Sequence, residues 1–528
     1  MGEKKSLFRG MEGHGTIMRK HHILTAVVAA AVFSLGASTL ALAGEESTSG
    51  GTFTYARSDS TTSFDLHQEI TENNAFAIDK VFESLVTFDN DGNIIDWLAE
   101  DHKISDDGLV YTFTLRDGLK FSDGTDVTAE DVKFSIERHL EVGGSLPIEV
   151  DVKSVEAVDE KTVEITLGTA YTPFLSELAN FSNGIIPKDF GGKTEEEFFK
   201  NPVGTGPFAV SEWDPSGDLT FVKNEYYWQE GKPYIDELVY KVVDDDNQAL
   251  NQLLAGEIDG IEDLSLSNAS NVDGNADTKT ATSFSYNVEE LFFNTLDEHF
   301  SDEHVRRALA MAIDRESLTK ALTFGYAEIA NTVLPRALLY QTNDTVNALS
   351  YDIDAAKEEL AQSAYPDGFD TTISIASGNN TRLQEAQIIQ AAGAQIGINI
   401  EINAQEISTF RSDFRDLNFS MMINSATADY PDANSIFAFQ VDPDGWSKCY
   451  WTSYNNETAA DLMRKGQVTP DGDERAAVYE ELQQILADEV PYIPLYNSEN
   501  VVGLRDNVEG FTVLPNGSVH FEDVYFEE

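Results

Sequence analysis

Apolar and polar residues alternate along this chain with two periods, one typical of strands and one typical of helices. In residues 111–115 apolar side chains alternate with threonine, which predicts a strand with one buried face. Thr128 then precedes an acidic first turn, a favourable helix start because free N–H groups and the helix dipole attract negative charge. Val132, Ile136 and Leu140 recur at helical spacing, so this helix is expected to bury the face that carries them.

The same alternation of strand-like and helix-like segments continues along the chain. Strands are predicted at residues 52–58, 162–167, 219–224, 237–243, 371–377 and 398–404. Helices are predicted at residues 73–85, 246–259, 302–314, 353–364, 381–397 and 473–490. Strands and helices that alternate in this way indicate an α/β fold. Breaks between folded units are expected at residues 201–210, 292–302 and 491–500.

Length and charge narrow the range of functions. At 528 residues the chain is long enough for two or more hydrophobic cores. It has 92 Asp and Glu residues against 35 Lys and Arg residues, which gives a formal net charge of -57. Such a field repels nucleic acid and anionic membrane surfaces, so neither is an expected partner. The acidic residues are spread along the chain, which indicates a solvated acidic surface rather than an acidic binding tail.

Residues 1–43 have the order of a secretory signal peptide. Basic residues from Met18 onward are followed by a largely apolar run and then by small residues up to Ala43, after which cleavage is expected. Met18 is also a candidate for the true start of the protein. The alternative, a retained membrane helix, is disfavoured because polar and small residues interrupt the apolar run. The signal peptide predicts export to the periplasm or the extracellular face of the membrane. Because Cys449 is the sole cysteine and lies far from the cleavage site, no lipid-anchor cysteine is expected.

Motifs that carry catalytic chemistry are missing from the sequence. No GxSxG, HExxH, Walker or GxGxxG motif follows a predicted strand, and the nine histidines show no metal-ligand spacing. Residues 89–100 put oxygen-bearing side chains at calcium-loop positions, but glycine stands at position 4 instead of 6, so a hairpin turn is the better interpretation. Nothing near Cys449 supplies a base. We therefore expect no enzyme, cofactor or metal site, and a ligand held in a cleft between lobes.

Several longer motifs occur in a fixed order. They include "VFESLVTFDNDGNIIDWLAEDHKISDDGLVYTFTLRDGLKFSDGTDVTAEDVKFSIER" (81–138), "NPVGTGPFAVSEW" (201–213), "LLAGEIDGIEDL" (253–264), "LFFNTLDEHFSDEHVRRALAMAIDRESLTKAL" (291–322), "ADYPDANSIF" (428–437) and "VPYIPLY" (490–496). Together these motifs resemble the extracellular solute-binding proteins of family 5, the receptors of the peptide/nickel class of ABC transporters. The resemblance covers nearly the whole chain after the signal peptide.

The resemblance implies a two-lobed periplasmic-binding-protein fold of the large peptide-receptor type, with an extra subdomain in lobe I and a hinge of two crossing segments. Lobe I would combine residues 44–85, 204–295 and 498–528, with the subdomain at 86–203 and lobe II at 296–497. The motif around residues 81–138 belongs to that subdomain and would be framework rather than ligand site.

The resemblance also points to a ligand-binding residue. Family members that carry peptides hold the peptide α-ammonium group with an aspartate in a motif like ADYPD, and Asp429 is the matching residue. A carboxylate opposite an ammonium group suits a closed cleft, because either charge left unpaired there is costly. Peptide receptors commonly have tryptophan three residues earlier, where this chain has Ala426. The alternative role of Asp429 is to cap the turn that follows it.

Weaker ligand-binding candidates come from the loop after the first strand, the return segment between the lobes, an aromatic pair and a lobe II arginine. They are Thr71, Glu72, Asn73, Tyr496, Asn497, Trp451, Tyr454 and Arg411. For the aromatic pair the alternative is core packing, and for the arginine it is a surface salt bridge.

The expected function is to capture oligopeptides or dipeptides and deliver them, as a monomer, to the transmembrane permease subunits of an ABC importer. Broad specificity would follow from contacts with the peptide backbone. The same transport role for a nickel chelate, haem, glutathione, an opine or an oligosaccharide is the main alternative. A sensory receptor that presents its ligand to a signalling partner is another, and a secreted hydrolase would need a nucleophile arrangement that the sequence lacks.

Overall fold

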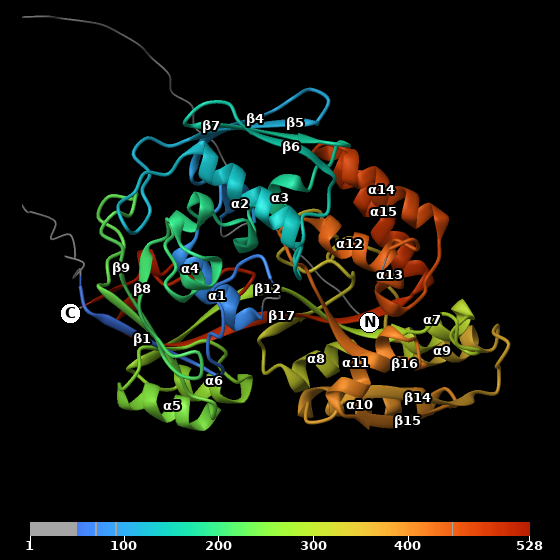
Figure 1. The fold of residues 1–528 in the computed structure, drawn as a ribbon. Helices are drawn as coiled ribbons and strands as arrows, with labels where there is room; N and C mark the ends of the chain where they lie inside the picture. Colours follow the sequence, from blue (N-terminus) through green and yellow to red (C-terminus); the bar gives the residue numbers. More distant parts are fainter. Residues whose placement is uncertain (1–49, 69–70, 90–91, 446, 528) are drawn as a thin grey trace, which may run out of the picture. The chain divides into compact units, whose positions relative to one another are not determined.

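The computed structural model describes residues 50–68, 71–89, 92–445 and 447–527, so the predicted signal peptide lies outside the described residues. The main feature is an 11-stranded sheet (Figure 1). In order across the sheet its strands are β15 (Ile398–Gln405), β14 (Phe369–Ala376), β16 (Met421–Thr427), β12 (Thr278–Phe293), β17 (Tyr492–Arg505), β11 (Gly260–Ile261), β1 (Thr52–Arg57), β10 (Glu237–Val242), β9 (Leu219–Lys223) and β8 (Phe208–Trp213), with β13 (Ala327–Ile329) paired to β17.

Strands β12 and β17 run antiparallel through both ends of this sheet and form its crossing segments. The first part of β12 pairs with β17 up to the pair Phe284–Glu499, and its last part lies between β17 and β16. The pairing resumes only at Val288–Asn497, so residues 285–287 face Ser498 without regular register. A bulge of this kind frees backbone and side chains for other contacts in the middle of a sheet.

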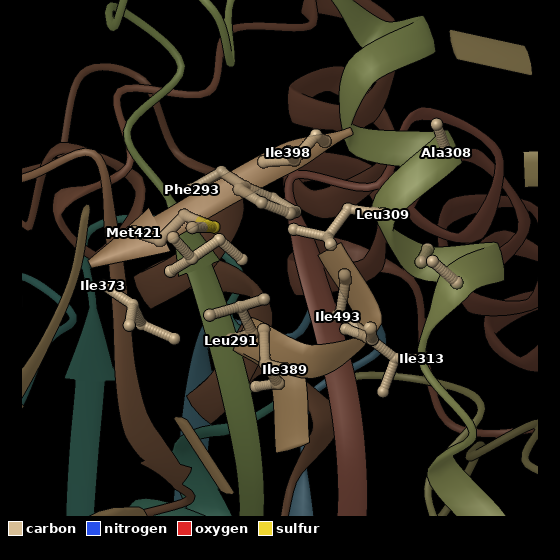
Figure 2. Close-up of a cluster of buried hydrophobic side chains, with 14 of the residues drawn as sticks. Leu291, Phe293, Ala308, Leu309, Ile313, Ile373, Ile389, Ile398, Met421 and Ile493 are labelled. Atoms are coloured by element: carbon tan, nitrogen blue, oxygen red, sulfur yellow. The ribbon is translucent and has the colours of Figure 1, made fainter. Parts of the chain in front are cut away.

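The end of the sheet that carries β14–β16 has a hydrophobic core on each face. On one face Leu291, Phe293, Ile373 and Met421 pack against helix side chains such as Leu309 (Figure 2). The helices on this face are α7 (Glu303–Ala312), α8 (Arg315–Leu322), α9 (Ile353–Leu360) and α10 (Asn380–Gln395). The other face is covered by α11 (Ile407–Arg415), α12 (Ala433–Val441), α14 (Glu457–Val468) and α15 (Asp473–Glu489). Two-sided cover explains why these strands are apolar on both faces.

The opposite end of the sheet has cores of its own. Aromatic side chains dominate one of them, where Phe53 and Tyr55 of β1 contact Phe521 and pack near α1 (Glu72–Val81). Helices α5 (Asp246–Ala255) and α6 (Leu266–Asp273) cover another apolar cluster. Short C-terminal elements complete this end: β18 (Val508–Glu509), the 3-10 turn η3 (Phe521–Asp523) and β19 (Tyr525–Phe526).

Residues 86–203 contain a separate four-stranded antiparallel sheet and a core that is largely their own. Its order is β4 (Ala99–Ile104), β5 (Val110–Leu115), β7 (Thr162–Leu167) and β6 (Val152–Ala157), with helices α2 (Ala129–Val142), α3 (Phe174–Leu178) and α4 (Glu195–Lys200) and the 3-10 turns η1 (Phe181–Asn183) and η2 (Lys188–Gly192). We call residues 86–203 the subdomain.

The predicted start of helix α2 is confirmed. Thr128 donates its backbone N–H and its hydroxyl to Asp131, at 2.8 and 2.7 Å, which satisfies donors at the helix start. Val132 and Ile136 are buried as expected, whereas Leu140 is 38% exposed, so its predicted burial is wrong. It lies in the last turn of the helix, beyond the edge of the small sheet's core.

The interpretation of residues 89–100 as a hairpin is also confirmed. Strands β2 (Val86–Phe88) and β3 (Ile94–Asp96) pair antiparallel, and Asp89 accepts hydrogen bonds from the backbone and the amide of Asn93. Asp89 is thus occupied with closing the turn. Within the described ranges no group of three His, Cys, Asp or Glu side chains is arranged to hold a metal ion.

The glycines of residues 201–210 permit a close approach to helix α1. A Cβ atom on Gly204 would lie 2.0 Å from the Val81 carbonyl oxygen, and one on Gly206 would lie 2.5 Å from that of Lys80. Gly206 donates its N–H to the Val81 oxygen. Only glycine fits there, and this contact fixes the end of α1 against the strand that follows.

Candidate ligand-binding site

A cavity of about 560 Å³ lies where the crossing strands, α1, the subdomain and the segment after β16 meet. The β12 bulge supplies Ser285, Tyr286 and Asn287 to its wall, and Ser498 and Glu499 of β17 face them. The remaining wall includes Thr71, Glu72, Trp97, Asn180, Phe181, Thr427, Asp429, Asn516 and His520. Its volume falls in the range of small-ligand sites. The irregular middle of the large sheet is therefore the floor of a ligand-sized space.

Asp429 reaches this cavity from the loop between β16 and α12. Its backbone is fixed on both sides: its N–H donates to the Ser435 hydroxyl at 2.8 Å, and its carbonyl accepts from the Asn180 amide at 2.8 Å. No hydrogen-bond or ion-pair partner for its carboxylate exists among the described residues, and its side chain stays accessible inside the cavity. Asp432, not Asp429, caps α12 by accepting from the Asn434 N–H.

The surroundings of Asp429 disfavour its charged form. Burial by the cavity walls is the main cause, the nearby Glu149 carboxyl adds to it, and together they raise the pKa of Asp429 to about 6. A cationic ligand group at this position would reverse the effect, because an opposite charge at short range stabilises the carboxylate. Among the described residues no cation lies against the Asp429 carboxylate to provide that charge.

The loop before α1 is only partly directed at the cavity. Thr71 and Glu72 line it, and burial, followed by repulsion from Asp263, raises the pKa of Glu72. Asn73 instead serves the framework: its carbonyl and its amide oxygen accept from the Arg57 guanidinium, each at 3.1 Å. Of this predicted trio, two residues face the cavity and one holds an arginine in place.

The other candidates lie away from the cavity wall. Tyr496 donates its hydroxyl to Glu385 at 2.5 Å, and Asn497 is buried with its amide oxygen accepting from the Arg336 N–H. Tyr454 is buried and donates to Glu489 at 2.7 Å. Tyr496 and Asn497 thus lie in a lobe core beside β12, and Tyr454 lies against α15. None of the three is part of the cavity wall.

Trp451 and Arg411 also serve other surroundings. The Trp451 ring packs edge-on against Phe414, and Arg411 is exposed on α11. Neither residue is part of the cavity wall. For the tryptophan, the alternative of aromatic packing is the arrangement found.

Sequence patterns did not reveal a polar end of the cavity built by α1 and the C-terminal segment. Asp79 and Lys80 form an ion pair at 2.9 Å, and His520 Nδ1 lies 2.9 Å from Glu522 Oε1, a contact that raises the pKa of His520. Glu83 accepts from the Trp97 indole at 2.8 Å. These residues stand alone in the sequence, and only the packing of residues 516–522 against α1 brings them together.

Glu83 is held entirely by neutral donors. Besides the Trp97 indole, its carboxylate accepts from the Tyr227 hydroxyl at 3.1 Å and from the Trp228 indole at 3.2 Å. Burial outweighs these hydrogen bonds and raises the pKa of Glu83 to about 7.

The cavity wall has a strong excess of carboxylates. Six of the described residues that line it carry a carboxyl group, and the two described basic residues of the wall, Lys80 and His520, are already paired. The six are Glu72, Asp79, Glu83, Asp429, Glu499 and Glu522. Among the described residues, therefore, no unpaired cation is offered to a ligand carboxylate.

Cys449 has no catalytic surroundings. Its side chain is buried, and burial, aided by Asp442, raises the pKa of the thiol to about 12. It lies in the turn α13 (Lys448–Trp451), whose four residues all have positive φ. A protonated, enclosed thiol is a poor nucleophile.

In the described part of the chain no helix has the length and apolar character needed to cross a bilayer.

Two lobes joined by long crossing strands, with a ligand-sized cavity at the crossing, define a two-lobed solute receptor. Solved structures agree. HbpA2 from Haemophilus parasuis superposes with a TM-score of 0.83 at 26% identity, over 90% of this chain and all (100%) of that one. The periplasmic binding protein DppA from Helicobacter pylori, solved with the peptide STSA, gives a TM-score of 0.76 at 27% identity, over 91% of this chain and 99% of that one.

Sequence comparison gives the family. The glutathione-binding protein GsiB of Escherichia coli O157:H7 is 28% identical over 452 residues, which is 84% of this chain and 88% of that protein. The model of the bacterial extracellular solute-binding proteins, family 5, matches residues 93–448. The chain belongs to this family of substrate-binding proteins of ABC importers. The family and the two-lobed fold expected from the sequence are confirmed.

Proposed function

We propose that this protein captures short peptides in the cavity and delivers them to the transmembrane subunits of an ABC importer. Asp429 pairs with the α-ammonium group of the peptide. The observation that carries the proposal is the Asp429 carboxylate, which faces the cavity without a partner among the described residues. A peptide ammonium group would supply the missing counter-charge. The remaining wall is rich in amide and hydroxyl groups, which suit a peptide backbone.

The names of similar proteins support a peptide as the ligand and leave glutathione as one alternative ligand. DppA was solved with a peptide, and GsiB is named for glutathione. Glutathione carries one ammonium group and two carboxylates. Asp429 suits the former, but the described residues of the cavity wall include no unpaired cation for the latter. An uncharged or basic peptide fits the charges better. The protein is proposed to act as an exported receptor that catalyses no reaction.

Two measurements test this function. The first is mass spectrometry of the solutes released by denaturing the purified protein. The second is calorimetric titration with trialanine and with N-acetyl-trialanine, which lacks the ammonium group. We expect a mixture of peptides, binding of trialanine, and a loss of about 30-fold or more in affinity for the acetylated form, since removing one partner of an enclosed charge pair costs at least ~2 kcal/mol.

The variant Asp429→Asn tests the anchor. It keeps the size of the side chain and removes its charge, so it should bind both trialanine forms with similar, weak affinity. Asp244→Asn, at an exposed site outside the cavity, is the matched control and should bind like the wild type. Equal affinity of wild type and Asp429→Asn for trialanine would remove the anchor. A single non-peptide solute released from the wild type would remove the peptide itself.

A further inference from the structure

A hydrogen-bonded cluster joins lobe II to the subdomain beside the cavity. Tyr430 and Asn434 belong to the segment after β16, while Glu149, Tyr171 and Glu177 belong to the subdomain. The Tyr430 hydroxyl lies 3.2 Å from the Tyr171 hydroxyl and 3.3 Å from Glu149 Oε2. The Asn434 amide donates to both hydroxyls, at 3.0 Å to Tyr171 and 3.3 Å to Tyr430. Three of these contacts (Tyr430 with Tyr171, Tyr430 with Glu149, and Asn434 with Tyr171) exist only while lobe II and the subdomain are together, whereas the contact of Asn434 with Tyr430 lies within lobe II.

On the subdomain side, Tyr171 connects two carboxyl groups. Its hydroxyl lies 3.0 Å from Glu177 Oε1 and 3.1 Å from Glu149 Oε2. Glu177 is buried, with 4% of its surface exposed, whereas Glu149 keeps contact with solvent. The second Glu177 oxygen accepts from the Glu149 N–H at 3.4 Å, its one hydrogen bond among the described residues. A buried carboxyl with such weak partners favours its neutral form.

The cluster has fewer hydroxyl protons than oxygen–oxygen contacts. Four such contacts join Tyr171, Tyr430, Glu149 and Glu177. The two tyrosines supply one proton each, and both hydroxyls already accept from Asn434. A proton on Glu177 would be donated to Tyr171, which would free the Tyr171 hydroxyl to donate to Glu149 while Tyr430 does the same. One added proton thus gives a continuous chain of donors from Glu177 to Glu149.

We propose that lobe II closes onto the subdomain with the uptake of one proton from solvent, which resides on Glu177 in the closed protein. In the open protein, Tyr430 and Asn434 withdraw, water solvates Tyr171 and both carboxyls, and Glu177 releases the proton. The cluster is therefore a pH-dependent latch on the ligand cavity. The proposal concerns closure itself and does not depend on the ligand being a peptide.

The direction of the pH effect follows from the environment of Glu177. Burial, strengthened by the charge of Glu149, raises the pKa of Glu177 well above its usual range in the closed protein. The closed state therefore binds more protons than the open state between the two pKa values, so lowering the pH through that window favours closure. Raising the pH above the closed-state pKa of Glu177 favours opening.

Other charged groups near the cluster have defined partners or a separate test. Asp432, which faces Glu177 and Tyr430, is paired with Arg475 at 2.7 and 2.8 Å. The Tyr111 hydroxyl donates to the Tyr171 carbonyl at 3.2 Å and does not enter the chain of protons. Asp429, one residue before Tyr430, also titrates, so the test includes a variant without its charge.

Contacts that do not titrate accompany the latch. The Thr172 N–H donates to the Gln467 carbonyl at 2.8 Å, and the Thr172 hydroxyl donates to the Thr469 carbonyl at 2.9 Å. These bonds keep a closed population at every pH. The proton on Glu177 changes the size of that population and does not create it.

The test measures closure in the absence of ligand. Cysteines at the exposed positions Asp106 in the subdomain and Glu480 in α15 carry spin labels, while Cys449 is buried. Electron–electron distances are measured on the full mature protein, freed of ligand by refolding, from about pH 5 to pH 9. We expect the short-distance population to grow as the pH falls. The same trend should persist with Asp429→Asn, which separates the latch from the ligand anchor.

Two variants decide the mechanism. Glu177→Gln carries a permanent N–H donor in place of the titrating proton, so its closed population should be high and should lose the part of the pH dependence that comes from Glu177. Tyr430→Phe removes the lobe II hydroxyl, so its closed population should be low, with the pH dependence reduced. Glu156→Gln, at an exposed site on β6, should behave as the wild type does. A wild type without pH dependence, or a Glu177→Gln protein with the wild-type pH dependence, would overturn the proposal.

Discussion

The Tyr430 hydroxyl lies 3.2 Å from the hydroxyl of Tyr171, a residue 259 positions earlier in the chain. Tyr430 directly follows Asp429, so the lobe contact and the proposed ligand anchor share one short loop. Closing the lobes and presenting the carboxylate to the ligand are therefore linked by covalent geometry. The two events have opposite pH dependence, since the ligand needs Asp429 charged and the latch needs Glu177 neutral.

The first prediction is a bell-shaped pH profile for the affinity of trialanine. Below about pH 6, where Asp429 takes up a proton, affinity should fall toward tenfold per pH unit, because proton and ammonium group compete for one carboxylate. At higher pH affinity should fall again as Glu177, whose pKa is raised by burial, loses its proton. Calorimetric titration in buffers from about pH 4.5 to pH 9 measures both limbs.

Each limb of that profile has its own control. In Asp429→Asn the fall in affinity at acid pH should disappear. In Glu177→Gln the part of the fall at alkaline pH that comes from Glu177 should disappear. The ammonium group of the peptide itself deprotonates near pH 8, so the contribution of Glu177 is the difference between wild type and Glu177→Gln. An acid limb that survives in Asp429→Asn would contradict the role of that carboxylate.

The second prediction concerns ligand charge. Because the cavity wall holds six carboxylates and its two basic groups are paired, alanyl-lysyl-alanine should bind more tightly than alanyl-glutaminyl-alanine, and alanyl-glutamyl-alanine least. We expect about tenfold or more between the first and the last, as for one desolvated charge contact. Competition against a fluorescent tripeptide measures the order.

The acidic surface of the whole protein would also attract cationic peptides, so this preference needs a local control. Added salt at about 0.5 M screens the distant charges more than those of an enclosed site. Glu72→Gln should reduce the preference for lysine, while Glu481→Gln on the exposed face of α15 should not. Loss of the whole preference in salt would assign it to the overall field.

The third prediction concerns Cys449. A buried thiol whose pKa is raised to about 12 should react slowly with Ellman's reagent in the folded protein and fully once the protein is unfolded in guanidinium. Cys449→Ala should bind trialanine as the wild type does, because the thiol lies outside the cavity wall. Fast modification of the folded protein, together with loss of binding, would show that the residue lies nearer the ligand than the structure places it.

Local sequence patterns predicted the elements well, because strands and helices here carry periods that backbone geometry enforces. The strand at residues 162–167 matches β7, and the acidic start at Thr128 marks α2. The predicted burial of Leu140 was wrong because periodicity identifies the buried face of a helix but not where the neighbouring sheet ends.

The binding site was less predictable. The motif pointed to Asp429, which lines the cavity, but Glu83 and His520 have no local signal, since only packing over hundreds of residues brings them to the same cavity. Tyr496 and Asn497 are the reverse case, because the sequence suggested them as ligand-binding residues and the structure places them away from this cavity. They directly precede Ser498, the β17 residue that faces the β12 bulge, and the register that turns them into the core is set by pairing with β12.

The last prediction concerns the ion pair that holds the loop carrying Asp429. Arg475 of α15 is 1% exposed and donates to both carboxylate oxygens of Asp432, at 2.7 and 2.8 Å, and it also contacts the exposed Asp471 at 2.7 Å. Asp432→Asn leaves the enclosed guanidinium with a neutral partner and should lower the free energy of unfolding by about 3 kcal/mol, since breaking a buried pair exposes the cost of the remaining charge.

Asp471 is the other partner of this arginine, and its side chain is 65% exposed. Asp471→Asn should therefore lower the free energy of unfolding by less than about 1 kcal/mol. Urea unfolding followed by far-ultraviolet circular dichroism gives both values. Because Asp432 also caps α12 through the Asn434 N–H, an asparagine there keeps the cap and isolates the charge. Similar losses from both variants would mean that the arginine is less enclosed in solution. A large loss from Asp432→Asn alone would establish this pair as the support of the loop that presents Asp429 to the cavity.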